Sequence, residues 1–127
     1  MIAVDTSAFM AIVLREPAGE ACKAALAADD DIMISAGTLA ELLIVAARRG
    51  IDEEITNVLD QLDINIVPVT TAVAKRVAEA YRRWGRGMHP AALNFGDCFA
   101  YVVAKAHACP LLFVGDDFAR TDIESVL

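Results

Sequence analysis

The chain opens with Met1-Ile-Ala-Val-Asp-Thr-Ser7, where a short apolar run ends in residues that favour the start of a helix. Ile2 and Val4 are β-branched, as is typical of strands. The side chains of Asp, Thr and Ser cap helix N-termini by accepting hydrogen bonds from unpaired backbone N–H groups. No helix breaker follows before Leu14. The stretch therefore predicts a strand that passes directly into a helix, with Asp5 at the junction.

The alternation of strand and helix continues along the chain. Further apolar runs predict strands over residues 32–34, 64–69 and 111–114. Helices with suitable start and stop residues are expected over residues 8–14, 20–28, 36–49, 52–62, 71–84 and 97–108. Strands that are apolar on both faces and separated by helices indicate an α/β fold, a three-layer sandwich whose mainly parallel sheet is flanked by helices. The length suits one domain, expected over residues 1–127.

Composition argues against several classes of protein. The hydrophobic fraction is 57%, but charges interrupt every apolar run before about 18 residues, the length that crosses a bilayer, so no membrane association is expected. The first residues lack the basic segment of a signal peptide, which predicts a cytoplasmic location. Cys22, Cys98 and Cys109 have no Cys-x-x-Cys spacing, so buried free thiols are expected rather than a zinc site.

The charge of the chain is unevenly distributed. The net charge of −7 argues against a nonspecific nucleic-acid coat. Residues 1–63 hold 12 acids and 4 bases, whereas residues 64–127 hold 6 acids and 7 bases. Any contact with phosphate is therefore expected from the second half. The candidate residues for such a contact are Arg82, Arg83 and Arg86, with Trp84 and His89 nearby. Their charges could equally well belong to a solvated helix face without any ligand.

Three carboxylates stand alone inside apolar segments. Asp5, Glu41 and Asp97 are the only charged residues within residues 1–14, 36–47 and 95–104, respectively. An ionised carboxylate that is buried without a partner is so costly that it would be neutralised. A shared cation would explain all three residues.

These acids are expected to meet at one edge of the sheet. Asp5 follows the first strand, and Asp116 and Asp117 follow the last one. Ligand sites in open α/β sheets lie beyond the carboxyl ends of the strands. Glu41 and Asp97 lie on predicted helices that could point into the same crevice. Oxygen ligands suit Mg²⁺ or Mn²⁺ better than zinc.

Each acid also has a structural alternative. Asp5 and Asp97 could be helix caps, Glu41 could form a salt bridge, and the two aspartates after the last strand could be turn residues. The hydroxyl groups of Thr6 and Ser7 could orient Asp5 or a bound water molecule. They could instead cap the helix.

Four segments together resemble the PIN-domain ribonucleases, and among them the VapC-type toxins of bacterial toxin–antitoxin pairs. They match in order and spacing across essentially the entire chain: Met1-Ile-Ala-Val-Asp-Thr-Ser-Ala8, Ser35-Ala-Gly-Thr-Leu-Ala-Glu-Leu42, His89-Pro-Ala-Ala-Leu-Asn-Phe-Gly-Asp-Cys-Phe-Ala-Tyr101 and Pro110-Leu-Leu-Phe-Val-Gly-Asp-Asp-Phe-Ala-Arg-Thr-Asp-Ile123.

The resemblance implies a PIN-like sandwich and a catalytic metal site. Asp5 and Asp97 would be the principal ligands of Mg²⁺ or Mn²⁺, and Glu41 and a fourth acid would complete the pocket. Asp117 fits the Gly-x-Asp-Phe pattern of the family, with Asp116 in reserve. Glu41 would position or deprotonate the attacking water, or hold a second ion.

The resemblance also implies partners. These toxins cut RNA such as tRNA or rRNA, are neutralised by a small cognate antitoxin and commonly form homodimers. A catalytically idle PIN-like subunit that binds RNA or protein is the alternative. A receiver domain would need an acidic pair after the first strand and a Lys after the last, and a phosphatase would need an acid at position 7; Thr6, Ser7 and the absence of a Lys after Val114 argue against both.

Overall fold

The computed structural model describes residues 1–127, and its centre is a four-stranded parallel sheet. The strand order is β3-β2-β1-β4, with β1 (Ile2–Val4), β2 (Ile32–Ser35), β3 (Ile64–Val67) and β4 (Leu111–Leu112). The helices are α1 (Thr6–Val13), α2 (Gly19–Ala28), α3 (Ala36–Arg49), α4 (Asp52–Asp60), α5 (Thr71–Trp84) and α6 (Phe95–Ala106), followed by a 3₁₀ turn, η1 (Phe118–Arg120).

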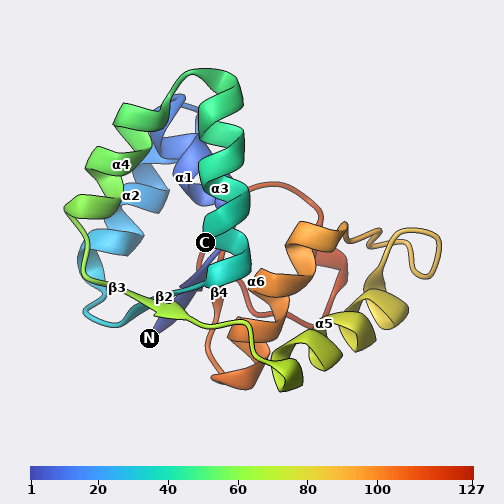
Figure 1. Cartoon of the computed structure of the whole chain (residues 1–127). Helices are drawn as coiled ribbons and strands as arrows, with labels where there is room; N and C mark the ends of the chain where they lie inside the picture. The colour runs from blue at the N-terminus through green and yellow to red at the C-terminus, as the bar shows by residue number, and fades with distance from the viewer.

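Helices cover both faces of the sheet, which confirms the predicted three-layer α/β architecture. The side chains of Ile2 and Val4 pack with α1 to α4 in one apolar core, and Ala3 points into a second core with α5 and α6. This alternation is the two-residue period of a strand with both faces buried. Figure 1 shows α1 to α4 gathered on one side of the strands and α5 and α6 on the other.

Two strands are shorter than predicted, for identifiable reasons. β3 ends at Val67 rather than residue 69 because Pro68 has no N–H to donate to a neighbouring strand. β4 ends at Leu112 rather than residue 114, and the Val114 N–H donates instead to the Ser7 hydroxyl (3.0 Å).

Helix boundaries differ most at α6. The prediction placed its start at Asp97, but the helix begins at Phe95 because Asn94 is the N-cap. The Asn94 side chain accepts from the Asp97 N–H (2.8 Å) and the Asp97 carboxylate accepts from the Asn94 N–H (3.0 Å), a reciprocal capping box. The helices predicted to reach residues 62 and 108 end at Asp60 and Ala106.

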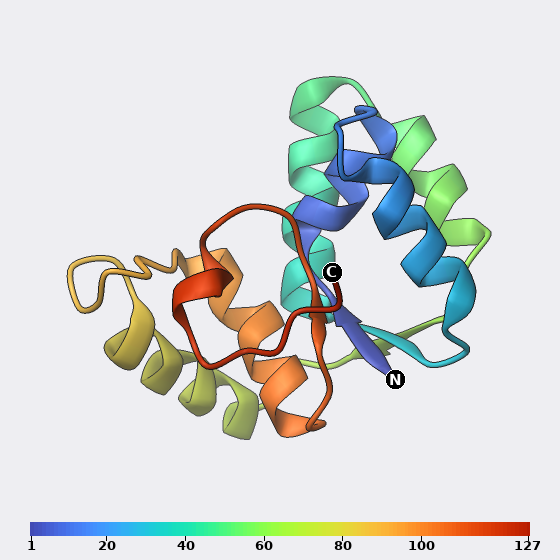
Figure 2. The same cartoon turned by 180° about the vertical axis from the view of Figure 1, so that it is seen from behind.

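The C-terminal segment returns to the sheet. After η1, Ser125 forms a parallel bridge with Leu111, and the Phe118 ring packs against Phe113. Seen from behind in Figure 2, this segment crosses α6 before it reaches the strands. It therefore ties the loop that follows β4 to the second core.

The predicted state of the cysteines is confirmed, since Cys22, Cys98 and Cys109 are all buried free thiols. None of the helices has the length and apolar character needed to cross a bilayer.

The start of α2 depends on a glycine. A Cβ on Gly19 would lie 2.5 Å from the backbone oxygen of Ala11, in a buried contact between α1 and α2. Gly→Ala normally stabilises a helix, but here we expect Gly19→Ala to lower the free energy of unfolding by about 1–3 kcal/mol because of overpacking. Urea denaturation measures the effect. The exposed Ala24→Ser on the same helix is the control, with a change within about 0.5 kcal/mol; a stabilised Gly19→Ala protein would contradict the close approach.

Candidate metal and RNA site

The Asp5 carboxylate lies at the end of β1 and caps α1. Its Oδ2 accepts hydrogen bonds from the Ser7 backbone N–H (3.1 Å) and the Ser7 hydroxyl (2.7 Å). Its Oδ1 is buried and has no hydrogen-bond partner, and the residue is only 4% exposed. Desolvation is the main reason why the pKa of Asp5 is raised, and the nearby Glu41 charge adds to it.

Ser7 connects this carboxylate to the last strand. Its hydroxyl donates to Asp5 and accepts from the Val114 N–H just beyond β4. The side chain of Asp5 is thereby held between two neighbouring strands, at the sheet edge where the carboxyl ends of parallel strands meet.

Glu41 faces the same region from α3. Its Oε1 accepts a hydrogen bond from the Thr6 hydroxyl (2.7 Å), and it forms no salt bridge. Gly96, next to Asp97, leaves room for this carboxylate, because a Cβ there would overlap its oxygens. Sequence reasoning missed the role of Gly96, although its place beside Asp97 in the motif was a usable signal.

Asp97 combines a cap with proximity to the other acids. Its Oδ2 closes the capping box, and no hydrogen bond reaches its Oδ1. Desolvation is the largest cause that raises its pKa to about 7, and the charges of Asp5, Asp117 and Glu41 also raise it. The structure thus brings the other three acids, Asp5, Glu41 and Asp117, within electrostatic range of Asp97.

The two aspartates after β4 are both exposed, but they differ in their relation to the site. Asp117 precedes η1, and its charge is among the largest causes that raise the pKa of Asp97, whereas Asp116 is not among those largest causes. The structure therefore favours Asp117 over Asp116 as a neighbour of the other acids.

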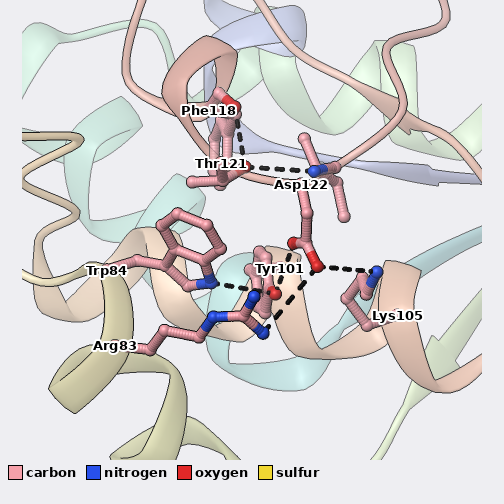
Figure 3. Close-up of polar contacts among 8 residues, drawn as sticks. Arg83, Trp84, Tyr101, Lys105, Phe118, Thr121 and Asp122 are labelled. Atoms are coloured by element: carbon pink, nitrogen blue, oxygen red, sulfur yellow. Dashed lines mark hydrogen bonds and ion pairs between the residues drawn. The ribbon is translucent and has the colours of Figure 1, made fainter. Parts of the chain in front are cut away.

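The C-terminal segment, which includes Asp117 and Asp122, is anchored to α6 by a polar network around Asp122 (Figure 3). The Tyr101 hydroxyl donates to Asp122 (2.6 Å) and accepts from the Trp84 indole N–H (3.0 Å). Lys105 also donates to Asp122 (3.1 Å), which helps to lower the pKa of Asp122 against the opposing effect of desolvation. Sequence reasoning missed this network; Tyr101, one helical turn after Asp97, was its only local signal.

The arginines predicted to contact RNA are not equivalent. Arg83 lies 3.9 Å from Asp122, and its guanidinium sits over the Trp84 ring at 4.6 Å. Arg82 and Arg86 are exposed and form no salt bridge. His89 packs edge-on against Trp84 and accepts a hydrogen bond from the Ala91 N–H.

Comparisons with known proteins identify the family of the chain. The model of the family described as "PIN domain" matches residues 2–124. The chain belongs to the PIN-domain family. It is 40% identical to ribonuclease VapC30 of Mycobacterium tuberculosis over 97% of this chain and 96% of that protein, which places it among the VapC proteins.

Solved structures share the fold. VapC20 of Mycobacterium tuberculosis, described as a sarcin-ricin loop cleaving toxin, has a TM-score of 0.78 and 19% identity and covers 99% of this chain and 98% of its own. A toxin–antitoxin complex from Klebsiella pneumoniae has a TM-score of 0.69 and 20% identity, with coverage of 96% and 93%.

The VapC-family acids fit a hydrated divalent cation better than a closed cage of ligands. No three acidic, histidine or cysteine side chains come close enough together to hold one ion. Thr6, Ser7 and Asn94 each bond to a different carboxylate, so the acids are held separately. Mg²⁺ commonly binds through one or two carboxylates and keeps several waters. The unpartnered Oδ1 atoms of Asp5 and Asp97 suit that mode.

The raised pKa of Asp97 predicts a pH-dependent stability. In the metal-free protein, Asp97 titrates at about 7 when folded and near 3.8 when unfolded, so the folded state binds more protons between these values. Its contribution to stability is therefore lost as the pH rises from about 4 to about 7. Asp97→Asn removes this titration while its carbonyl can still accept from Asn94.

We expect Asp97→Asn to have a higher free energy of unfolding than the wild type at about pH 8 in EDTA. At about pH 4.5 the difference in free energy of unfolding between the two proteins should be smaller. The pKa displacement from 3.8 to about 7 sets an upper bound of about 4 kcal/mol. Chemical denaturation at both pH values measures the difference, with Asp116→Asn as the matched control. A difference that is the same at both pH values would rule out the titration.

Proposed function

We propose that this VapC-family chain, a single PIN domain over residues 1–127, is an endoribonuclease toxin that hydrolyses RNA phosphodiester bonds with Mg²⁺ or Mn²⁺. The observation that carries the proposal is the buried, unpartnered Oδ1 of Asp5 beside the elevated-pKa carboxylate of Asp97. Buried acids without partners call for a cation, and the named ribonucleases among its relatives support the reaction.

Asp5 and Asp97 would hold the cation through their Oδ1 atoms. When bound, a divalent ion would lower the pKa of a water molecule and would stabilise negative charge on the phosphate and on the leaving oxygen. Ser7 and Asn94 keep the two Oδ2 atoms occupied. These hydrogen bonds fix the direction in which each free oxygen points.

Glu41 is the candidate general base. Thr6 holds its Oε1, and the space above Gly96 accommodates the rest of the carboxylate, so its orientation is restrained. A carboxylate in hydrogen-bond reach of the attacking water can accept its proton. Asp117, which is exposed and whose charge acts on Asp97, would orient a water or a ligand; Asp116 would remain outside the reaction.

Arg82 and Arg86 are the stronger candidates for contacts with RNA phosphates. Neither is engaged in a salt bridge, whereas Arg83 is directed to Asp122 and Trp84. The substrate class would be a structured RNA such as tRNA or rRNA. The cleavage of the sarcin-ricin loop by VapC20 supports an rRNA substrate as one option.

The proposed partners are a cognate antitoxin and a second copy of the chain, in the cytoplasm. The similarity to a toxin–antitoxin complex supports the antitoxin. Leu43 and Ile44 are large exposed apolar side chains on α3, which favours a homodimer. A catalytically idle RNA- or protein-binding subunit is the rival, and the presence of all four acids argues against it.

Purified, antitoxin-free protein is expected to cut total RNA into discrete fragments in Mn²⁺ and to lose this activity in EDTA. Asp5→Asn should reduce cleavage by more than about 100-fold, because even indirect disruption of a metal site costs about 10–100-fold. Gel analysis of the fragments measures cleavage. Asp116→Asn is the matched control and should retain activity, whereas Asp117→Asn should lose part of it. Cleavage that survives both EDTA and Asp5→Asn would refute the metal mechanism.

Metal binding is also expected to stabilise the fold independently of RNA. At about ten times the dissociation constant, Mn²⁺ should raise the melting temperature by about 5 °C. The calorimetric shift should be absent in an Asp5→Asn, Asp97→Asn double variant. An unchanged melting temperature in millimolar Mn²⁺ would show that the acids do not form a cation site.

A further inference from the structure

We propose that the groove between α5 and the start of α6 binds one unpaired nucleobase of the substrate RNA, with the Phe95 ring as its stacking surface. This inference rests on the proposed RNA-cleaving function and assigns a binding site beside the acids. The groove has a volume of about 500 Å³ and includes Val77, Tyr81, Arg86, Asn94 and Phe95 in its lining.

Phe95 is unusually exposed for an aromatic residue in an ordered helix. It is 70% exposed, and its one aromatic contact is an edge-on approach to Phe99 with ring centroids 5.0 Å apart. This contact orients the ring without covering it. The capping of α6 depends on Asn94 and Asp97 and gives no reason for an aromatic side chain between them.

The position of Phe95 relates it directly to the acids. The next residue, Gly96, lies against the Glu41 carboxylate, and Asp97 follows. Consecutive Cα atoms are about 3.8 Å apart, so the Phe95 Cα lies within about 8 Å of the Asp97 Cα. An RNA cut at an internal bond extends on both sides of the scissile phosphate. A base flanking that bond could therefore reach this ring.

The groove has the chemistry of a nucleotide site. Its walls are mainly apolar, as a base face requires, and Arg86 is its single charged residue. Arg86 has no acidic partner, so its guanidinium is available for a phosphate. The Asn94 Oδ1 serves the cap, while its amide group donates no hydrogen bond and could bind the edge of a base. The combination favours a nucleotide over a purely apolar partner.

The test uses a fluorescent, unstructured RNA of roughly ten nucleotides and the cleavage-deficient Asp5→Asn protein. Phe95→Leu keeps an apolar side chain but removes the π-face, and Phe95→Tyr keeps the ring. We expect Phe95→Leu to weaken RNA binding about five- to hundredfold, the range for loss of one stacked base. Phe95→Tyr should bind within about threefold of the parent, and Arg86→Gln should reduce the salt dependence of binding.

An abasic scan of the same RNA identifies the base. Removal of one particular base should weaken RNA binding by the parent protein, which has Phe95. The same abasic RNA should lose little further affinity for the Phe95→Leu variant, because the two changes remove the same contact. Sedimentation of each variant measures its oligomeric state. Equal affinities of the Leu and parent proteins, or independent losses at every abasic position, would overturn the proposal. If Phe95→Leu changes the oligomeric state and its effect on RNA affinity is independent of every abasic position, the groove is instead an interface between two copies of the chain.

Wild-type cleavage separates this inference from the proposed function. Metal-dependent cleavage with no effect of Phe95→Leu on RNA binding would overturn only the base site. Absence of any metal-dependent cleavage by the wild-type protein would overturn the ribonuclease assignment, whatever the binding data show.

Discussion

The carboxylates of Asp5 and Asp97 are both buried at the carboxyl edge of the sheet, where the charge of Asp5 raises the pKa of Asp97 and the charge of Glu41 raises the pKa of Asp5. Water would normally relieve such repulsion, but both residues are under 10% exposed. Hydrogen bonds from the protein therefore have to take the place of water in stabilising the ionised carboxylates. This constraint accounts for the capping hydroxyl of Ser7, the bond from Thr6 to Glu41, and the missing side chain at Gly96.

Helix capping and metal binding are often treated as competing explanations for an aspartate, but here they use different oxygens. Asp5 and Asp97 each direct Oδ2 to a cap, and neither Oδ1 accepts a hydrogen bond. The cap restricts the side-chain torsions and so aims the second oxygen. Part of the stability of α1 and α6 is thereby coupled to the geometry of the site.

Sequence periodicity was sufficient for the architecture because strands buried on both faces and separated by helices have few other arrangements. The isolated acids were visible because charge in an apolar segment is rare. Local contacts were less accessible. The start of α6 was wrong by two residues because Asn94 caps it, and the link from Tyr101 to Asp122 spans 21 residues. Nor did sequence show that Arg83 is directed to Asp122, since that pairing arises only when the C-terminal segment crosses α6.

The distribution of charge also links metal binding to RNA binding. The charges of Asp5, Glu41 and Asp117 all act on Asp97, so in the proposed site the metal-free protein would repel the phosphate of a substrate. The arginines without a salt bridge, Arg82 and Arg86, lie at and beyond the end of α5. A cation held by Asp5 and Asp97 would lower the repulsion, and a phosphate would add a ligand to the cation. By linkage each should strengthen the binding of the other, so the acids that would repel a phosphate from the metal-free site would favour its binding once they hold a cation.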